Sequence, residues 1–168
     1  MSSGSGIFYY RLRIIDPISG CSEPSSNVIT ITVIADPTTS IAVNNQSICV
    51  GGSALITSSV TPGSGVYAYQ WETATSGAGP WSAIGGATNA TYNVPSVTAG
   101  VRFYRLQVTD NLNGCADPIS NTVSVTVNPV PSISVAPVQP VCLGSSVVLV
   151  SIATNGTGGF TYQWQTAE

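Results

Sequence analysis

Two short segments that alternate between apolar and polar side chains constrain the fold of this chain more than any other feature. Residues 66–71 read Val-Tyr-Ala-Tyr-Gln-Trp, and residues 103–108 read Phe-Tyr-Arg-Leu-Gln-Val. A period of two is that of a β-strand, in which alternate side chains share one face. The two segments therefore predict a pair of half-buried strands with Trp71 facing the core on one and Leu106 on the other.

Similar runs, separated by turns rich in Gly, Pro, Asn and Ser, fill the middle of the chain. They predict strands over residues 39–48, 53–60, 66–73, 81–84, 91–94, 101–109 and 122–128, and no helix longer than one turn. A buried Trp on one strand, with a Tyr two residues before a core position on a later strand, is typical of an immunoglobulin-type sandwich. We therefore predict an all-β, immunoglobulin-like β-sandwich with a central core of Ile56, Trp71, Tyr104 and Leu106.

The chain repeats itself with a period of 93–94 residues. Tyr10-Arg11-Leu12 reappears as Tyr104-Arg105-Leu106, and Tyr69-Gln70-Trp71 reappears as Tyr162-Gln163-Trp164. We therefore predict a tag or linker at 1–6, the last two strands of a first repeat at 7–36, a complete repeat at 37–129 and the first three strands of a third repeat at 130–168. Neither partial repeat contains the equivalent of residues 75–100.

Each predicted partial repeat leaves a row of apolar side chains uncovered. Such rows favour strand addition between chains, so we expect the chain to associate with itself, head to tail, as a dimer or filament. The residues expected at these edges are Tyr10, Leu12 and Ile14 on the first repeat and Phe160, Tyr162 and Trp164 on the third.

Four local patterns in the complete repeat resemble a known class of tandem repeat. They are Cys49-x-Gly51-x-Ser53, Tyr69-x-Trp71, residues 86–92 (Gly-Ala-Thr-x-x-Thr-Tyr) and residues 113–117 (Asn-Gly-Cys-Ala-Asp). Together they resemble the bacterial immunoglobulin-like repeats of large secreted surface proteins and adhesins of the Bacteroidetes, gliding adhesins included. The resemblance implies a secreted or cell-surface location and a structural or adhesive role, with no catalytic residues shared across the class.

The cysteines do not occupy the positions of the disulfide found in antibody domains. Cys49 precedes the second predicted strand and Cys115 follows the sixth, so the strand order places them at opposite ends of the sandwich. A disulfide requires Cα atoms within about 7 Å. A bond within the repeat would need a loop that folds back, and bonds between repeats or chains (Cys49 to Cys21, Cys142 to Cys115) or plain thiols are the alternatives.

Two other kinds of site are weaker candidates. Trp81 and Tyr92 could stack on sugars, which would make the chain a glycan-binding or protein-binding adhesin module on a monomeric stalk, although strand pairing is the commoner use of such rings. Asp110 and Asp117 flank one loop and could begin a calcium site, but calcium takes six to eight oxygen ligands and loop aspartates usually cap turns.

Composition excludes several other functions. The sequence has no His and no Lys, so the commonest catalytic bases are absent and we expect neither an enzyme nor a cofactor. A net charge of −3 argues against nucleic acid as a partner. No run approaches 18 consecutive apolar residues, so we expect no membrane span.

Overall fold

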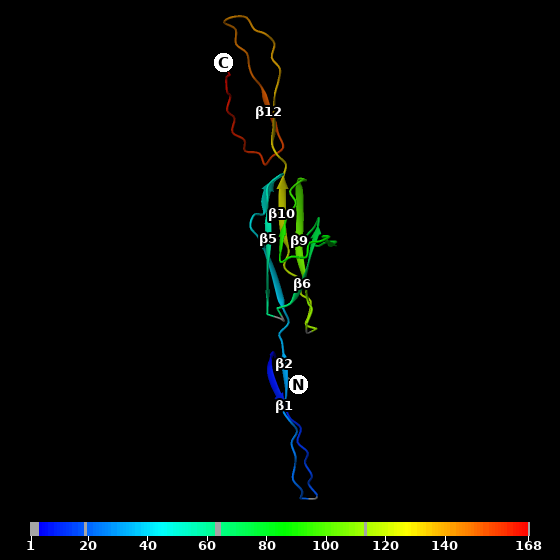
Figure 1. The fold of residues 1–168 in the computed structure, drawn as a ribbon. Coiled ribbons are helices and arrows are strands. Elements are labelled where there is room, and N and C mark those ends of the chain that lie inside the picture. The colour runs from blue at the N-terminus through cyan, green and yellow to red at the C-terminus, as the bar shows by residue number, and fades with distance from the viewer. Residues whose placement is uncertain (1–3, 19, 63–64, 113, 168) are drawn as a thin grey trace.

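The computed structural model describes residues 4–18, 20–62, 65–112 and 114–167. Figure 1 shows three parts in series: an N-terminal hairpin, a central sandwich and a C-terminal part. The first three residues of the predicted linker, and Asn113 of the Asn-Gly-Cys pattern, lie outside the described residues. The described residues contain strands and no helix, so none of them forms a helix that could cross a membrane. The prediction of an all-β chain is confirmed.

The central sandwich is built from two sheets. The larger sheet has the order β4-β10-β9-β6-β7, and the smaller has the order β3-β5-β8. The strand bounds are β3 Thr38–Val43, β4 Ser47–Cys49, β5 Leu55–Thr61, β6 Tyr67–Ala74, β7 Ser82–Ala83, β8 Thr91–Asn93, β9 Gly100–Asp110 and β10 Val123–Asn128. β4 runs parallel to β10 and every other pair in the two sheets is antiparallel.

The two alternating segments, residues 66–71 and 103–108, lie on adjacent strands of the larger sheet, β6 and β9. β6 and β9 pair antiparallel with Trp71 opposite Leu106. Along β9, Tyr104, Leu106 and Val108 are buried while the residues between them are half-exposed, as a period of two requires.

A core of large side chains lies between the sheets. Ile56, Trp71 and Leu106 expose none of their surface, and Tyr104 exposes 3%. The Tyr92 ring lies between those of Trp71 and Tyr104, with ring centroids 5.8 Å and 5.7 Å away. The Trp71 indole N–H donates to the carbonyl of Asn89 at 2.8 Å, so the one polar atom of this buried ring is satisfied.

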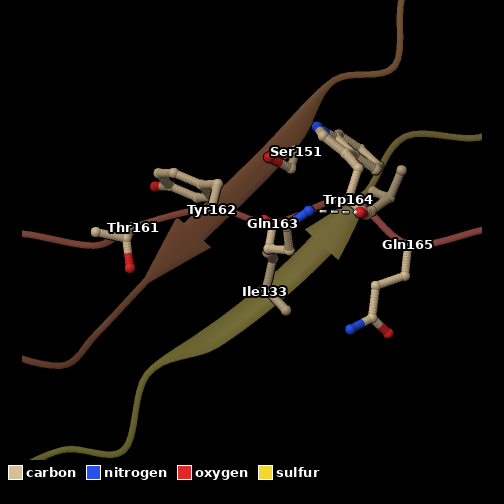
Figure 2. Close-up of a pocket in the computed structure, with 8 residues that line it drawn as sticks. Ile133, Ser151, Thr161, Tyr162, Gln163, Trp164 and Gln165 are labelled. Atoms are coloured by element: carbon tan, nitrogen blue, oxygen red, sulfur yellow. Dashed lines mark hydrogen bonds between the residues drawn. The ribbon is translucent and has the colours of Figure 1, made fainter.

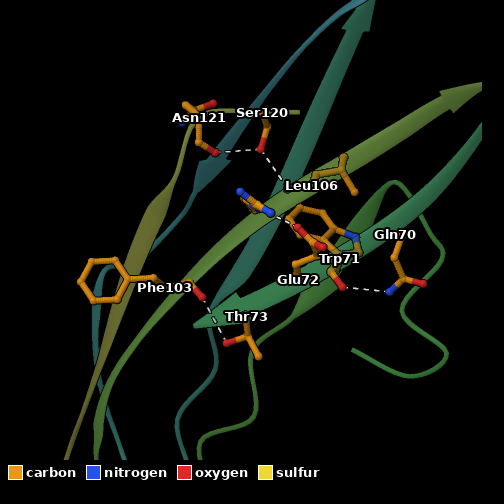
Figure 3. Close-up of polar contacts among 9 residues, drawn as sticks. Gln70, Trp71, Glu72, Thr73, Phe103, Leu106, Ser120 and Asn121 are labelled. Carbon is orange, nitrogen blue, oxygen red and sulfur yellow. Dashed lines mark hydrogen bonds and ion pairs between the residues drawn. The ribbon is translucent and has the colours of Figure 1, made fainter. Parts of the chain in front are cut away.

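Polar contacts fix the larger sheet around this core (Figure 3). The Leu106 N–H donates to Ser120 Oγ at 2.9 Å, and Ser120 Oγ–H donates to the carbonyl of Asn121 at 2.7 Å. Arg105, also on β9, pairs with Glu72 on the neighbouring strand β6 at 2.5 Å. The path from β9 to β10 is therefore held by side chains as well as by the strand ladder.

The first predicted strand is wrong as a single element. Instead of one strand over 39–48, β3 lies in the smaller sheet and β4 in the larger one. The strand changes sheet at residues 44–46, where Asn44 Oδ1 accepts the N–H of Leu55 at 2.8 Å. This side-chain bond ends the β3–β5 ladder, and the chain then crosses to β10, as strands at sandwich corners do.

The N-terminal part is one long hairpin. β1 (Gly6–Tyr10) and β2 (Ile29–Val33) pair antiparallel, and an isolated bridge joins Arg13 to Ser25 farther along. Arg13 and Glu23 form an ion pair across the same hairpin. The apolar side chains on its faces stay largely exposed.

The C-terminal part contains β11 (Ser132–Val135) and β12 (Ser151–Thr154), paired antiparallel. The third strand expected here is not formed: residues 155–167, which include Trp164, are in turns and irregular backbone. In the central sandwich the corresponding strand, β6, is held by the ladder of β9. The described C-terminal residues offer no such neighbour, so the backbone there has no ladder to join.

Candidate self-association surfaces

The N-terminal hairpin carries the first group of predicted edge residues. Tyr10, Leu12 and Ile14 are all exposed, Leu12 by 70%. A shallow groove of about 280 Å³ lies beside Tyr10 and Leu12, with Ile29 on its wall. An apolar groove of this kind on a two-stranded hairpin is a surface suited to docking. We call Tyr10, Leu12, Ile14 and Ile29 the hairpin surface.

The C-terminal part carries the second group. Tyr162 and Trp164 are exposed, Trp164 by 50%, and Phe160 is half-buried. A groove of about 340 Å³ lies between Trp164 and β11, where Ile133 and Val135 line it. Figure 2 shows Tyr162 and Trp164 on a segment that crosses the strands carrying Ile133 and Ser151. We call Ile133, Val135, Phe160, Tyr162 and Trp164 the Trp164 surface.

The hairpin reproduces the β9–β10 pair of the central sandwich. Adding 94 to each partner turns the β1–β2 register, Tyr10 opposite Ile29, into the β9–β10 register, Tyr104 opposite Val123. The isolated bridge Arg13–Ser25 likewise becomes Gln107–Ile119. The same backbone arrangement thus occurs twice, once inside the sandwich and once alone.

Side-chain hydrogen bonds on the hairpin also repeat those of the β9–β10 pair at a shift of 94 residues. The Leu12 N–H donates to Ser26 Oγ at 2.9 Å, as the Leu106 N–H does to Ser120 Oγ. Ser26 Oγ–H then donates to the carbonyl of the following Asn at 2.8 Å. The hairpin therefore keeps these bonds although no second sheet covers it in the structure.

The C-terminal part reproduces the β3–β5 pair of the smaller sheet. The β11–β12 pair, Ser132 opposite Thr154, repeats the β3–β5 pair, Thr38 opposite Thr61, with shifts of 94 and 93. The turn after Cys142 repeats the turn after Cys49: Ser145 donates to the carbonyl of Cys142 as Gly52 does to that of Cys49.

We call residues equivalent when they differ by 94 (6–34 with 100–128 and 132–135 with 38–41) or by 93 (141–167 with 48–74). Every buried apolar residue of the central sandwich except Val94 has an apolar equivalent in a terminal part, and all but the half-buried Val33 are exposed there. The pairs are Ile41–Val135, Ile48–Val141, Ala54–Val147, Ile56–Leu149, Trp71–Trp164, Ala74–Ala167, Tyr104–Tyr10, Leu106–Leu12, Val108–Ile14, Val125–Ile31 and Val127–Val33.

One contact at this site was not found from sequence. Asn121 Oδ1 accepts the N–H of Ile41 at 2.8 Å, and Asn121 Nδ2 donates to the carbonyl of Ile41 at 3.0 Å. The side chain thereby ties β3 to the segment that precedes β10. Its equivalent, Asn27, belongs to the repeated Ser-Asn pair, but only a contact 80 residues away reveals what the Asn does.

Two of the four cysteines, Cys49 and Cys115, lie at opposite ends of the central sandwich. Cys49 is opposite Asn128 at the last position of β10, and Cys115 lies in the loop after β9. Cys49, Cys115 and Cys142 are thiols rather than disulfides in the structure. Burial, with the carboxylates of Asp110 and Asp36 nearby, raises the pKa of the Cys115 thiol.

The remaining candidates have structural contacts. Asp110 Oδ1 accepts the N–H of Leu112 at 3.2 Å and caps a turn, and Asp117 Oδ1 accepts the N–H of Asp110 at 3.2 Å across the loop. Among the described residues, no group of three or more His, Cys, Asp or Glu side chains could hold a metal ion. The face of the Trp81 ring is covered by Arg105, whose guanidinium carbon lies 4.5 Å from the ring centroid.

Strand order and core together define the class: the central part is an immunoglobulin-like β-sandwich. The chain belongs to the family described as "Domain of unknown function (DUF8696)", which matches residues 38–129. Among solved structures, the PKD domain of human KIAA0319, determined in solution, is similar at 20% identity with a TM-score of 0.44. That match covers 64% of this chain and 91% of the PKD chain. No curated protein matches the chain.

Proposed function

We propose that this chain is a non-enzymatic structural and adhesive repeat segment of the extracellular space, and that its copies join head to tail. The hairpin surface of one chain packs on the Trp164 surface of the next, and the two together form another immunoglobulin-like sandwich. The observation that carries this proposal is the equivalence between the buried core of the central sandwich and the exposed residues of the two terminal parts.

The strand register supports one particular arrangement of the joint. In the central sandwich β6 adds to the edge of β9, with Trp71 opposite Leu106. The equivalent pairing places residues 160–167 of one chain along β1 and residues 11–16 of the next, with Trp164 opposite Leu12. Strand addition of this kind satisfies the backbone of both chains and buries one face of each.

Apolar burial at the joint is large enough to offset the cost of association. Burying a side chain the size of Leu or Val contributes about 1.5–3 kcal/mol, and association costs about 4–15 kcal/mol. The side chains of this set of eleven equivalent residues are about half exposed before association, so each contributes about half of that figure, and together the eleven are comparable with the cost of association. Residues 7–36 and 130–168 include no equivalents of β7, β8 and Val94, so a joint made of these residues alone is expected to be less stable than the central sandwich.

The geometry favours an open series of chains. The two surfaces differ from each other and lie at opposite ends of the molecule (Figure 1). Contacts between unlike surfaces extend into filaments unless a rotation closes them into a ring. Sandwiches of this class are common in cell-surface proteins, which supports an extracellular location and a role in spacing or linking.

A pair of blocked variants tests the arrangement. Leu12→Asp places a carboxylate in the joint from the hairpin side, and Leu149→Asp places one from the other side. Each variant alone is expected to be a monomer, because every joint that it could form contains the Asp. A mixture of the two is expected to form dimers and nothing larger, because it contains one intact surface of each kind.

Ile18→Asp is the matched control. Ile18 is 93% exposed, and its equivalent, Leu112, is also exposed in the central sandwich, so this variant is expected to associate like the unaltered chain. A mixture of the blocked variants that stays monomeric would contradict head-to-tail joining, as would a blocked variant that still forms long assemblies. A monomeric stalk would then be the better description.

A further inference from the structure

The four cysteines lie where consecutive sandwiches would meet. We propose that each joint between chains is locked by two disulfide bonds: Cys49 to Cys21 of the next chain, and Cys142 to Cys115 of the next chain. This inference rests on the head-to-tail assembly proposed above and adds to it a covalent, redox-controlled step.

A bond within the central sandwich is excluded by distance. Cys49 lies at the end of the larger sheet where Gly100 begins β9, and Cys115 follows Asp110, where β9 ends. β9 has 11 residues, so at about 3.3 Å per residue the two ends are about 30 Å apart. Disulfides require Cα atoms within about 7 Å.

The loop that carries Cys115 lies against the linker that precedes the sandwich. The N–H of Ala116, the residue after Cys115, donates to Asp36 Oδ1 at 3.0 Å. Asp36 belongs to the four residues between the end of β2 and the start of β3. Cys115 therefore lies at the junction between the central sandwich and the unit before it.

Cys49 lies at the opposite junction. It pairs with Asn128, and the N–H of Val50 donates to the carbonyl of Asn128 at 2.9 Å. Only residues 129–131 separate Asn128 from β11. Cys49 is therefore beside the linker that leads to the next unit.

Completing the joint brings these two positions together. When the hairpin of the next chain occupies the place of β9 and β10 in the new sandwich, a shift of 94 puts its Ser22 at the place of Ala116 and puts Val130 at the place of Asp36. Val130 has no carboxylate, so the hydrogen bond from Ala116 to Asp36 has no counterpart there, and the path of the backbone alone sets this position. Cys21, adjacent to Ser22, then lies about two residue steps, roughly 7 Å, along the linker from Asn128 and its neighbour Cys49.

The second pair follows from the same geometry at the other end of the joint. Cys142 is the equivalent of Cys49, so in the new sandwich it lies beside Ile34 of the next chain, the equivalent of Asn128. Cys115 of that next chain is held against Asp36, two residues beyond Ile34. In each pair, one cysteine lies beside the linker that leaves one sandwich, and the other lies beside the linker that enters the following sandwich.

The chemistry requires an external oxidant. For each bond two thiols lose two electrons and two protons, and a small-molecule disulfide such as oxidised glutathione accepts them to become two thiols. Oxidising conditions of this kind are found outside the cell. Reduction reverses the step and leaves the non-covalent joint in place.

Peptide mapping can read the pairing directly. Equal amounts of unlabelled and ¹⁵N-labelled chain are mixed, oxidised with a glutathione redox buffer and cleaved on the amino side of Asp. Cleavage at the four aspartates, Asp16, Asp36, Asp110 and Asp117, puts each cysteine on its own peptide. The expected products are Cys21–Cys49 and Cys115–Cys142 peptide pairs, with mixed isotope labels among them because each bond joins two chains.

Cys142→Ser supplies the internal control. Cys115 is then expected to react with iodoacetamide after oxidation, while the Cys21–Cys49 pair still forms. Linked Cys49–Cys115 peptides, random pairing of all four cysteines, pairs without mixed labels, or thiols that stay reduced would each overturn the inference.

Native mass in excess reductant separates this inference from the proposed assembly. Multimers in reductant without the expected peptide pairs would overturn the disulfides and leave the assembly standing. Monomers in reductant, together with the expected mixed-label pairs after oxidation, would overturn the non-covalent assembly and leave the disulfide pairing standing. Monomers in both conditions would overturn both proposals.

Discussion

The side chain of Asn121 holds the backbone of Ile41 at both its N–H and its carbonyl, at 2.8 Å and 3.0 Å. Ile41 lies on β3 in the smaller sheet, and Asn121 lies two residues before β10 in the larger one. One amide thus joins the two layers of the sandwich. Its equivalent on the hairpin, Asn27, would make the same two bonds to Val135 of another chain if the proposed joint forms.

Asn121→Ala is expected to destabilise the central sandwich. The substitution removes both hydrogen bonds and supplies no other group to bind the N–H and carbonyl of Ile41. The free energy of unfolding should therefore fall by about 1–3 kcal/mol. Urea unfolding followed by Trp fluorescence measures this, in the Leu12→Asp background so that association does not contribute. A change in the free energy of unfolding below about 0.5 kcal/mol would mean that the two Asn121 hydrogen bonds do not stabilise the sandwich.

Asn27→Ala is expected to weaken association between chains without changing the stability of the central sandwich. The exposed Asn27 side chain lies outside the central sandwich, so the free energy of unfolding of that sandwich should not change. Association between chains should weaken about tenfold or more, because the joint loses two hydrogen bonds. Sedimentation at several concentrations measures the effect, and unaltered association would show that Asn27 does not bind the next chain.

Trp71→Ala and Trp164→Ala separate the core from the proposed joint. Trp71 is fully buried, so its replacement should cost about 3–5 kcal/mol of stability. Trp164 is half exposed, and its replacement should leave the unfolding of the central sandwich unchanged while abolishing association. Calorimetry and light scattering on the two variants measure these effects. Association that survives Trp164→Ala would place the joint elsewhere.

Alkaline pH is expected to destabilise the central sandwich. Burial raises the pKa of Tyr92, and burial together with the neighbouring Tyr92 raises the pKa of Tyr104. Between the ordinary Tyr pKa of about 10 and the raised values, the unfolded chain loses protons that the folded chain retains. The contribution of these two tyrosines to stability should therefore be fully present below about pH 10 and be lost as the pH rises further.

Absorbance at 295 nm and unfolding curves between neutral pH and alkaline pH test this. The double variant Tyr92→Phe, Tyr104→Phe cannot ionise at these positions, so its stability should decline less steeply. An identical alkaline decline in the variant would assign the effect to other groups.

Much of the central sandwich could be predicted from the sequence because its strands are two-sided. The alternation around Trp71 and Leu106 fixes which side chains face inward, and in the structure those two residues are opposite each other in the β6–β9 ladder. The change of sheet after β3 could not be predicted, because it depends on a hydrogen bond from Leu55 to the Asn44 side chain. Asn and Leu residues at that spacing give no distinctive pattern.

The C-terminal part shows a second limit of prediction. Residues 160–167 have the alternation of a strand, and their equivalents form β6, yet they are irregular here. A strand needs a neighbour to pair with, and sequence alternation reports the preference but not whether the neighbour is present. Likewise, the cysteine positions in the strand order were predictable, whereas the contact of Ala116 with Asp36 that locates Cys115 at a junction was not.

Native mass spectrometry in excess reductant over a range of chain concentrations tests the central claim most directly. The account predicts a series of species at whole multiples of 17.2 kDa, with the larger multiples gaining population as the concentration rises. A single species of 17.2 kDa at every concentration would contradict it, because the hairpin surface and the Trp164 surface would then have no affinity for each other.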